Sequence, residues 1–481
     1  MHSTTAAVVA TPNYLLVNGL TLIAALGGLL FGYDTAVISG AVGAIDANFI
    51  TPRGLPETAA GSLSGWTISC ALFGCVIGAA LAGPISQRIG RRGGLIIAAV
   101  LFFVSAIGSA FPEFGLGPVG GMGPAALTPF ILYRILGGIG VGIASMLSPL
   151  YIAEIAPPAQ RGRLVTYQQV AIVVGMTLVY FVNWAIAAQG DDAWILSTGW
   201  RYMLLSGAIP AGLFLLLLLL VPETPRWLVM KGRSEKAHEV LLRLSTPDEA
   251  RTVLGEIEGS LTEASGKLFA FGGVVVFVGI MLSVFQQFVG INAVLYYAPL
   301  MFKNMGASTD SALLQTIIVG IANIVFTLVA LVTVDRWGRK PLLVLGALVM
   351  AASMIALGFL FSTGHVGTPA LIAAVAYIAG FALSWGPVVW VLLSEIFPNI
   401  IKSRAMAIAV AMQWIANLFV SLSFKVLDGN STLNALFHHG FTYWIYGGMS
   451  VLAALFVLRY VPETKGRTLE AIQHLWVKPA S

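Results

Sequence analysis

The sequence predicts an all-α integral membrane protein of about twelve transmembrane helices, arranged as two six-helix halves. Hydrophobic residues make up 58% of the 481 residues and charged residues only 10%, whereas soluble domains carry about 25% charged residues. Apolar stretches long enough to cross a bilayer recur along the chain, and several short motifs occur once in each half. Lipid must therefore surround most of the chain, because each span of about 20 apolar residues needs an apolar solvent.

The apolar stretches form two sets of six that flank a central polar segment. They cover roughly 15–38, 60–84, 93–113, 126–152, 164–187 and 200–221, then 270–302, 311–333, 341–363, 367–394, 404–424 and 441–460. We therefore expect an N-terminal six-helix bundle over 1–221, a cytoplasmic helical linker over 222–269, a C-terminal six-helix bundle over 270–462 and a cytoplasmic tail over 463–481. Within the linker, Ser234–Leu244 has the pattern of a short amphipathic helix with Ser234 as its N-cap.

Lys and Arg gather in alternate loops, which orients the chain because cytoplasmic loops carry an excess of these residues. One side has Arg88, Arg91, Arg92, Arg161, Arg163, Arg336, Arg339, Lys340, Lys402, Arg404, Lys465, Arg467 and Lys478, and the other little beyond Arg53, Arg201, Lys303 and Lys425. We expect a multi-pass protein of the cell inner (plasma) membrane with both termini in the cytoplasm. The same bias explains the net charge of +5, so no nucleic-acid partner is expected.

Internal repeats indicate that the two sets of spans are duplicated halves. Val-Pro-Glu-Thr occurs at 221–224 and 461–464, the basic motif at 88–92 is echoed at 336–340, and Glu154 is echoed by Glu395. Matching halves are typical of proteins that carry a solute along the interface between them. Channels can also contain repeats, so the polar residues inside the spans must decide the kind of protein.

Two opposite charges lie inside the first half, where a charge is costly and needs a reason. Asp34 lies in the first span and Arg134 in the fourth. A carboxylate at the bilayer centre costs about 2.5–3.5 kcal/mol on insertion scales, and pairing with Arg134 would offset that cost. The pair is either a static ion pair or a titratable one, in which protonation of Asp34 frees the arginine and drives a rearrangement.

Amide side chains concentrate in the spans of the second half, with two more in the first. They are Gln286, Gln287, Asn292, Asn323, Gln413 and Asn417, together with Gln168 and Gln169. An amide donates and accepts hydrogen bonds, which suits a polyol, and Trp390 could pack on a sugar ring. These residues predict a sugar site, although any single amide could instead join two helices.

Charged residues at the cytoplasmic ends of the spans predict a gate. Glu154 and Glu395 each close a span, and the basic residues that can reach them are Arg91, Arg92, Arg161, Arg163, Arg339, Lys340, Lys402 and Arg404. Ion pairs among them would hold the inner side shut and would break for inward opening. Anchoring by the positive-inside bias is the plainer interpretation, and both can hold together.

These motifs are similar to those of sugar porters of the major facilitator superfamily. The resemblance extends from about Gly27 to Glu470. It rests on Gly-Arg-Arg at 90–92, Tyr151–Glu154 with Arg161-Gly162, Pro-Glu-Thr-Pro-Arg at 222–226, Gln286-Gln287 through Asn292, Asp335–Arg339 and Pro462–Gly466. Within the family, the chain most resembles bacterial carriers that move D-xylose with a proton, and it is also similar to a bacterial glucose facilitator.

The resemblance implies the major facilitator fold with a central cavity, and it implies roles for matching residues. Sugar hydroxyls would be bound by Gln169, Gln286, Gln287, Asn292, Trp390 and Gln413. The same cavity would be lined by Phe31, Met176, Tyr296, Asn323, Gly386 and Trp414. Asp34 matches the proton acceptor of the symporters, with Arg134 as its partner.

Three positions depart from the family pattern. Gly207 stands where the xylose carriers have a buried glutamate near the Asp–Arg pair, which bears on proton coupling. Met176 replaces a cavity-lining glutamine, which bears on the choice between pentose and hexose. Lys402-Ser403 replaces Arg-Gly, which weakens that part of the inner gate.

The sequence therefore predicts proton-coupled symport of D-xylose by alternating access, with D-glucose as a second substrate or a bound inhibitor. The alternative is a proton-independent glucose and xylose uniporter, and a sugar sensor is less favoured. A channel is disfavoured because no carboxylate ring or pore loop is evident, and an enzyme because no metal-ligand cluster or nucleophile–base pair stands out in the spans. We expect a monomer with no cofactor or metal, whose partners are a sugar, a proton and the lipid bilayer.

Overall fold

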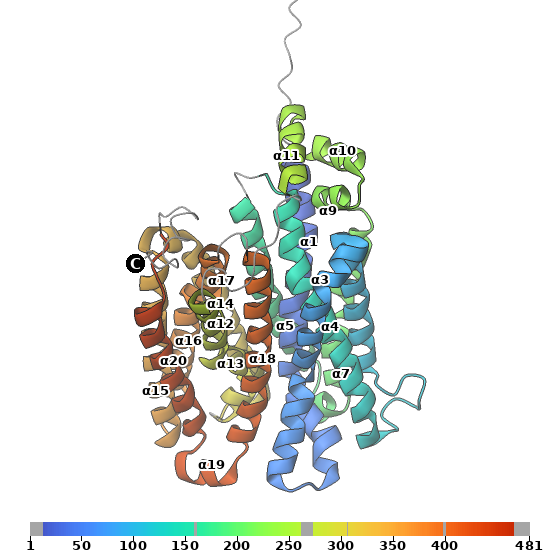
Figure 1. Cartoon of the computed structure of the whole chain (residues 1–481). Helices are drawn as coiled ribbons and strands as arrows, with labels where there is room; N and C mark the ends of the chain where they lie inside the picture. Colours follow the sequence, from blue (N-terminus) through green and yellow to red (C-terminus); the bar gives the residue numbers. More distant parts are fainter. Residues whose placement is uncertain (1–12, 158–160, 261–272, 305, 398–400, 466–481) are drawn as a thin grey trace, which may run out of the picture.

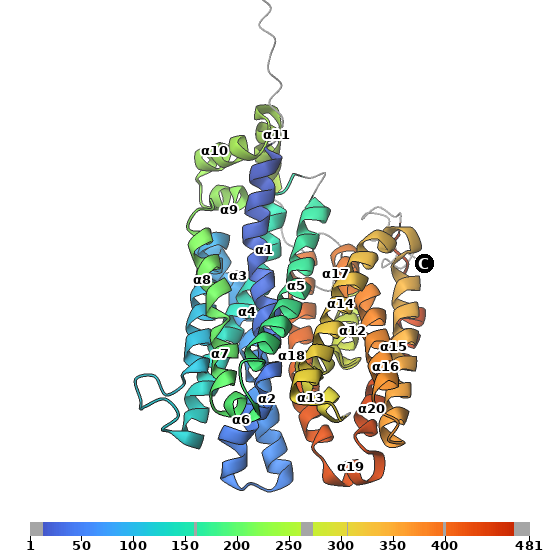
Figure 2. The same cartoon turned by 180° about the vertical axis from the view of Figure 1, so that it is seen from behind.

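The computed structural model of the chain describes residues 13–157, 161–260, 273–304, 306–397 and 401–465. Over these residues it is all helix and loop, without a strand. Two helical bundles lie side by side, one built from the N-terminal part of the chain and one from the C-terminal part (Figures 1 and 2). The all-α class predicted from composition is confirmed.

The long helices of the first half are α1, α3, α4, α5 and the pair α7 and α8. Their bounds are α1 (Tyr14–Val37), α3 (Glu57–Ala110), α4 (Leu127–Ile155), α5 (Arg161–Ala187), α7 (Trp200–Leu205) and α8 (Ala208–Leu218). Short helical turns join them: α2 (Val42–Ile45), η1 (Ile38–Gly40), η2 (Asp46–Ile50), η3 (Thr51–Arg53), η4 (Gly123–Ala126), α6 (Asp192–Trp194) and η6 (Ile195–Gly199).

The second half repeats this plan with two broken spans. Its helices are α12 (Gly273–Phe288), α13 (Ile291–Asn304), α14 (Thr309–Trp337), α15 (Arg339–Ser362), α16 (Thr368–Leu383), α17 (Trp385–Ile396), α18 (Lys402–Asp428), α19 (Ser431–Phe437) and α20 (Gly440–Tyr460). Pairs α12–α13 and α16–α17 each make one apolar stretch of spanning length.

The described residues contain 11 helical stretches that are long and apolar enough to cross a membrane. One of them, Glu57–Ala110, has 54 residues and is interrupted by non-helical backbone at Gly90, which separates two helical segments. Divided at Gly90, α3 supplies two spans, so the structure agrees with the predicted twelve. Several outward-facing residues are large and apolar, such as Leu132, Phe359 and Phe419, as lipid contact requires.

The break at Gly90 has a counterpart at Gly338, and a glutamate fixes each one. Gly90 and Gly338 have φ of 91° and 93°, a left-handed conformation that glycine adopts without strain. Glu223 accepts hydrogen bonds from the backbone N–H groups that follow Gly90, and Glu463 does the same after Gly338. The glutamate of each Val-Pro-Glu-Thr motif therefore stabilises the glycine turn of its own half through the same backbone hydrogen bonds.

We expect Gly90→Ala to destabilise the protein by about 1–3 kcal/mol, because a side chain is strained at this φ and a Cβ there would overlap the Glu223 carboxylate. The measurement is the midpoint of thermal unfolding in detergent. Gly83→Ala is the matched control, since Gly83 lies within α3 with open space around it. Equal unfolding midpoints for the two variants would contradict the role given to the turn.

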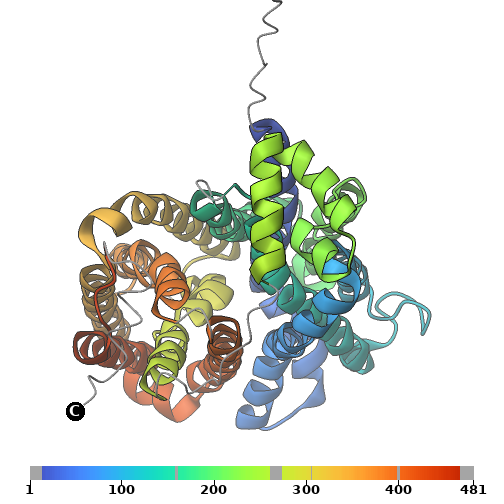
Figure 3. The same ribbon diagram turned by 45° about the horizontal axis from the view of Figure 1, so that its top comes forward.

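Three short helices form the linker and lie over the first half (Figure 3). They are α9 (Pro225–Met230), α10 (Ser234–Leu244) and α11 (Pro247–Ser260). The bounds predicted for α10 are correct, but its predicted N-cap is wrong. Arg233 holds the N-cap position, while the Ser234 hydroxyl donates to Glu258 of α11 instead. We call the end of the bundle that carries these helices the linker side, and the other end the far side.

Close helix contacts within the first half depend on small residues. Gly74 and Gly78 of α3 meet backbone atoms of α4, and Gly138 and Gly142 of α4 meet those of α3. Such small residues let membrane helices approach closely without hydrophobic driving force between them. The two cysteines, Cys70 and Cys75, are buried in the same helix and are free thiols.

Candidate functional site

The two broken spans of the second half bring polar groups to its centre. Gly290, with φ of 93°, separates α12 from α13. Ser384 separates α16 from α17. Broken helices inside a bilayer are tolerated where other groups satisfy the freed backbone atoms. Here the Gln286 amide donates to the carbonyl oxygens of Trp385 at 2.8 Å and Gly386 at 3.2 Å. A side chain near the end of α12 therefore satisfies backbone atoms at the break between α16 and α17.

The predicted amides form one hydrogen-bonded chain, which we call the amide cluster: Gln286, Gln287, Asn292 and Gln413. Gln413 donates to the Gln286 amide oxygen. Asn292 donates to the Gln287 amide oxygen at 2.6 Å, and the Gln287 amide nitrogen donates to the Gln286 amide oxygen at 3.5 Å. Helices α12, α13 and α18 therefore meet through their amides.

The amide cluster is largely buried but keeps unused hydrogen-bonding capacity. Gln286, Gln287 and Gln413 are 2%, 5% and 9% exposed. The amide oxygen of Gln413 is buried without a hydrogen-bond partner in the structure, as are both amide atoms of Gln168 on α5. Because a buried unpaired amide costs about 1–3 kcal/mol, these atoms favour a ligand that donates and accepts, as a hydroxyl does.

Aromatic side chains connect the amide cluster to the first half. The rings of Phe31 on α1 and Trp414 on α18 lie 5.3 Å apart. Asn417 donates to the Tyr296 hydroxyl at 3.4 Å, and that hydroxyl also lies next to Thr35 of α1. The predicted lining residues on α1, α13 and α18 are thus in contact across the two halves.

Four predicted site residues are not tied to this cluster. Trp390 and Gln169 are half-buried, on α17 and α5. Met176 and Asn323 are both 6% exposed, and Met176 lies against Gly32 of α1. Among the hydrogen bonds and ring contacts of described residues, none joins these four to the amide cluster. Their predicted roles remain predictions.

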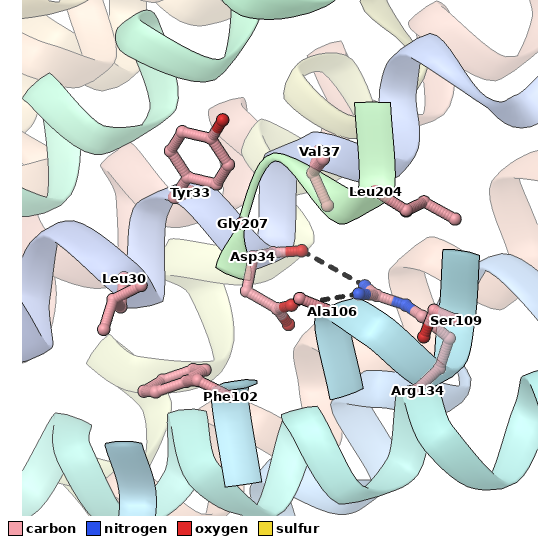
Figure 4. A pocket seen from close by; sticks show the side chains of 10 residues that line it. All are labelled: Leu30, Tyr33, Asp34, Val37, Phe102, Ala106, Ser109, Arg134, Leu204 and Gly207. Atoms are coloured by element: carbon pink, nitrogen blue, oxygen red, sulfur yellow. Dashed lines mark hydrogen bonds and ion pairs between the residues drawn. The ribbon is translucent and has the colours of Figure 1, made fainter. Parts of the chain in front are cut away.

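Asp34 and Arg134 meet in the first half, as predicted (Figure 4). Arg134 donates to the Asp34 carboxylate at 3.0 Å and to the Asp34 backbone oxygen at 3.1 Å. Arg134 is 2% exposed and Asp34 is 9% exposed. The second carboxylate oxygen of Asp34 and the Nε of Arg134 are buried without a partner in the structure, so the hydrogen-bonding capacity of the ion pair is incompletely satisfied.

A small cavity adjoins this pair, with room of about 10 Å³, close to what one water molecule needs. Its lining residues are Leu30, Tyr33, Asp34, Val37, Phe102, Ala106, Ser109, Arg134, Leu204 and Gly207 (Figure 4). Gly207 lies between α7 and α8, where a Cβ would meet no atom closer than 3.5 Å. The departure at Gly207 therefore leaves space beside Asp34.

The predicted gate glutamates form matching clusters on the linker side, each inside its own half. Glu154 of α4 pairs with Arg91 at 2.8 Å and accepts from Thr224. Glu395 of α17 pairs with Arg339 at 2.8 Å and accepts from Thr464. Sequence reasoning missed both threonines, although the repeated Val-Pro-Glu-Thr motif was the available signal.

The remaining predicted gate residues are placed differently or lie outside the description. Arg92 donates to the carbonyl oxygens of Leu218 and Leu219 at the end of α8 and does not reach Glu154. Arg161 is the first residue of α5 and Arg404 lies in the first turn of α18, but their side chains lie outside the described part of the chain. Their predicted gate contacts are therefore open.

The two helix-turn glutamates differ in proton affinity. Burial raises the pKa of Glu223 above its ordinary value, despite backbone N–H groups that donate to it. Burial also acts on Glu463, but N–H donors of Lys465, Arg339 and Lys340 hold its pKa below the ordinary value. The carboxylate of Glu463 is therefore more strongly held in its ionised form than that of Glu223.

A duplicated twelve-span bundle with a buried ion pair in one half and a buried amide cluster in the other defines a membrane transporter of the major facilitator type. The family model described as "Sugar (and other) transporter" matches residues 20–476. The chain belongs to this sugar transporter family.

The chain is 55% identical to the D-xylose-proton symporter of Escherichia coli strain K12, over 95% of each sequence. It is 49% identical to the glucose facilitated diffusion protein of Zymomonas mobilis, over 96% of this chain and 98% of that one. Among solved structures, the inward-open xylose transporter of Escherichia coli matches with a TM-score of 0.86 and 52% identity, covering 96% of this chain and all of that one.

Proposed function

We propose that this protein is a sugar–proton symporter that carries D-xylose, with D-glucose as a second ligand, across the cell inner membrane by alternating access. The observation that carries the proposal is the placement of Asp34 on α1. It lies three residues after Phe31, or about 4.5 Å along the helix axis. Phe31 contacts the ring of Trp414 beside the amide cluster, so one helix turn touches both the sugar site and the ion pair.

This arrangement supports coupling because both ligands act on α1. Protonation of Asp34 would weaken its attraction to Arg134, whose other bond goes to the α1 backbone. A sugar that replaces amide–amide bonds in the cluster would draw α13 and α18 toward α1 through Tyr296 and Trp414. Each ligand thus changes the same inter-half contacts, as linkage requires.

The sugar roles of Gln286, Gln287, Asn292 and Gln413 belong to this proposal, as do those of Gln169 and Trp390. Binding would exchange hydrogen bonds between the amides for bonds to sugar hydroxyls. The net gain for each such bond is about 0.5–1.5 kcal/mol. Several bonds together give the modest affinity that a carrier needs in order to release its solute.

The linker side is assigned to the cytoplasm. Among the described residues of the predicted basic excess, Arg91 and Arg339 pair with their glutamates on this side, which also carries α9, α10 and α11; this supports a cytoplasmic assignment by the positive-inside rule. Both termini then face the cytoplasm, and the far side is extracellular. The halves 1–221 and 270–462 act as the two moving units, and a monomer suffices because the sugar path lies within one chain.

A proton-independent facilitator is the second candidate, and Gly207 favours it. Gly207 places no acidic side chain beside Asp34, and one relative is named a glucose facilitated diffusion protein. Asp34 and Arg134 are nevertheless both present and paired, which favours symport.

Uptake of labelled D-xylose into proteoliposomes tests the sugar assignment. We expect an inward proton gradient to drive accumulation, with unlabelled D-xylose and D-glucose competing and a non-sugar solute of similar size not competing. Uptake that does not depend on the proton gradient would identify a facilitator. Absence of competition by any sugar would overturn the sugar assignment.

A further inference from the structure

An ion pair joins the two halves on the far side of the bundle. Lys425, in the last turn of α18, lies 2.9 Å from the carboxylate of Asp46, the first residue of η2. The side chains are 13% and 29% exposed, so the pair is partly shielded from water. Ser64 of α3 donates to the other oxygen of Asp46, so the acceptor is held from the first half.

This pair differs in kind from the other ion pairs. Among pairs between described side chains, those of Arg91, Arg134 and Arg201 lie within the first half. Those of Arg339 and His439 lie within the second half. Within the described part of the chain, only the Asp46–Lys425 pair links residues of different halves, so it alone among these pairs changes when the halves rock apart at this end.

Close packing around Lys425 shows that helices of the two halves are in contact at this point. A Cβ built on Gly65 of α3 would lie 3.1 Å from the Leu422 carbonyl oxygen and 3.3 Å from the Lys425 Cβ. Nearer the middle, the Tyr180 hydroxyl of α5 donates to the Leu295 carbonyl oxygen of α13 at 2.9 Å. The ion pair therefore sits on a far-side contact where helices of the two halves touch.

We propose that Asp46 and Lys425 form the outer gate of the transporter, an ion pair that holds the far side closed and must break each time the outward-open state forms. It stabilises the closed state relative to the open one, because separation returns both charges to water and leaves Asp46 with its Ser64 bond alone. The inference rests on the alternating access of the proposed function. It assigns the outer gate to residues that have no role in sugar or proton binding.

The size of the effect follows from the burial of the pair. The pair is partly buried and Asp46 has a fixed hydroxyl partner, so its contribution lies toward the upper end of that of exposed ion pairs. We therefore expect loss of the pair to raise the ratio of outward-open to inward-open protein about threefold to fivefold.

Spin-label distance measurements on the full-length protein in nanodiscs test the proposal. Labels are attached through Glu57→Cys on α3 and Leu436→Cys on α19, which are exposed far-side positions in different halves. Both native cysteines are buried, so the introduced thiols take the label. We expect Lys425→Met and Asp46→Asn each to increase the long-distance population about threefold or more. The exchange of charges in the double variant Asp46→Lys, Lys425→Asp should reverse part of that increase.

The control is His439→Asn, which removes the 2.9 Å pair between His439 and Asp428 inside the second half. It should leave the distance distribution as in the unmodified protein. Unchanged distributions in both Lys425→Met and Asp46→Asn would overturn the gate. The distance measurement needs neither sugar nor proton gradient, so it can fail while transport stands, and the reverse is also true.

Discussion

Replacement of Asp34 by asparagine should abolish sugar accumulation while downhill sugar exchange continues. The reason is energetic. Inward movement of one proton releases about 2.3 kcal/mol per 100 mV, and each tenfold sugar gradient costs about 1.4 kcal/mol. One proton can therefore sustain roughly a forty-fold gradient at about 100 mV. The asparagine side chain of the variant carries no titratable proton, so the accumulation ratio should fall to about one.

Paired assays on the same proteoliposomes measure this effect. Accumulation under an imposed proton gradient is compared with counterflow, in which labelled sugar exchanges against unlabelled sugar without net proton movement. Asp310→Asn is the matched control, because Asp310 is an acid at the start of α14, remote in sequence from the ion pair. Accumulation by the Asp34→Asn protein equal to that of the control would exclude Asp34 as the coupling residue.

Gln287→Ala should abolish measurable sugar transport while the protein still folds and reaches the membrane. Gln287 is 5% exposed and is the acceptor for Asn292 across the break between α12 and α13. In the proposed sugar site, its loss removes hydrogen bonds to the sugar and leaves the Asn292 amide without its partner. At about 1–3 kcal/mol for an unpaired buried group, sugar affinity should fall about fivefold to 150-fold.

Binding of labelled sugar to purified protein separates this effect from misfolding. Gln189→Ala provides the control, since Gln189 is exposed at the end of α5 and its side chain donates to the Ala185 carbonyl oxygen of its own turn. Both variants should elute as one peak in gel filtration, and only Gln287→Ala should lose sugar binding. Normal uptake by Gln287→Ala would show that the amide cluster is not the sugar site.

The spans and the internal repeat could be predicted because both are local properties of the sequence. Apolar length alone located the helices, and the repeated glutamate motif predicted matching halves. The break between the predicted spans 60–84 and 93–113 was also predicted, and the structure places it at Gly90, where α3 is interrupted as Gly338 separates α14 from α15. The N-cap at Ser234 was misassigned because its hydroxyl finds a long-range partner in Glu258, which outweighs the local capping preference.

Contacts between distant residues were the part that sequence could not supply. Gln286 was recognisable as a buried amide, but its bonds to the backbone of Trp385 depend on where α17 begins. Lys425 looked like an exception to the positive-inside pattern, and its partner Asp46 lies in the other half of the chain. The pairing of Asp34 with Arg134 could be predicted because both charges lie inside spans, whereas nothing in the sequence connected Lys425 to Asp46.

Sugar-dependent proton uptake tests the central claim most directly. Proteoliposomes containing the unmodified protein and an internal pH indicator are mixed with D-xylose in the absence of any imposed gradient. Symport predicts that inward sugar flow acidifies the lumen, that a protonophore removes the signal, and that Asp34→Asn does not produce it. Sugar entry at an undiminished rate with no change in internal pH would contradict the account and identify a facilitator.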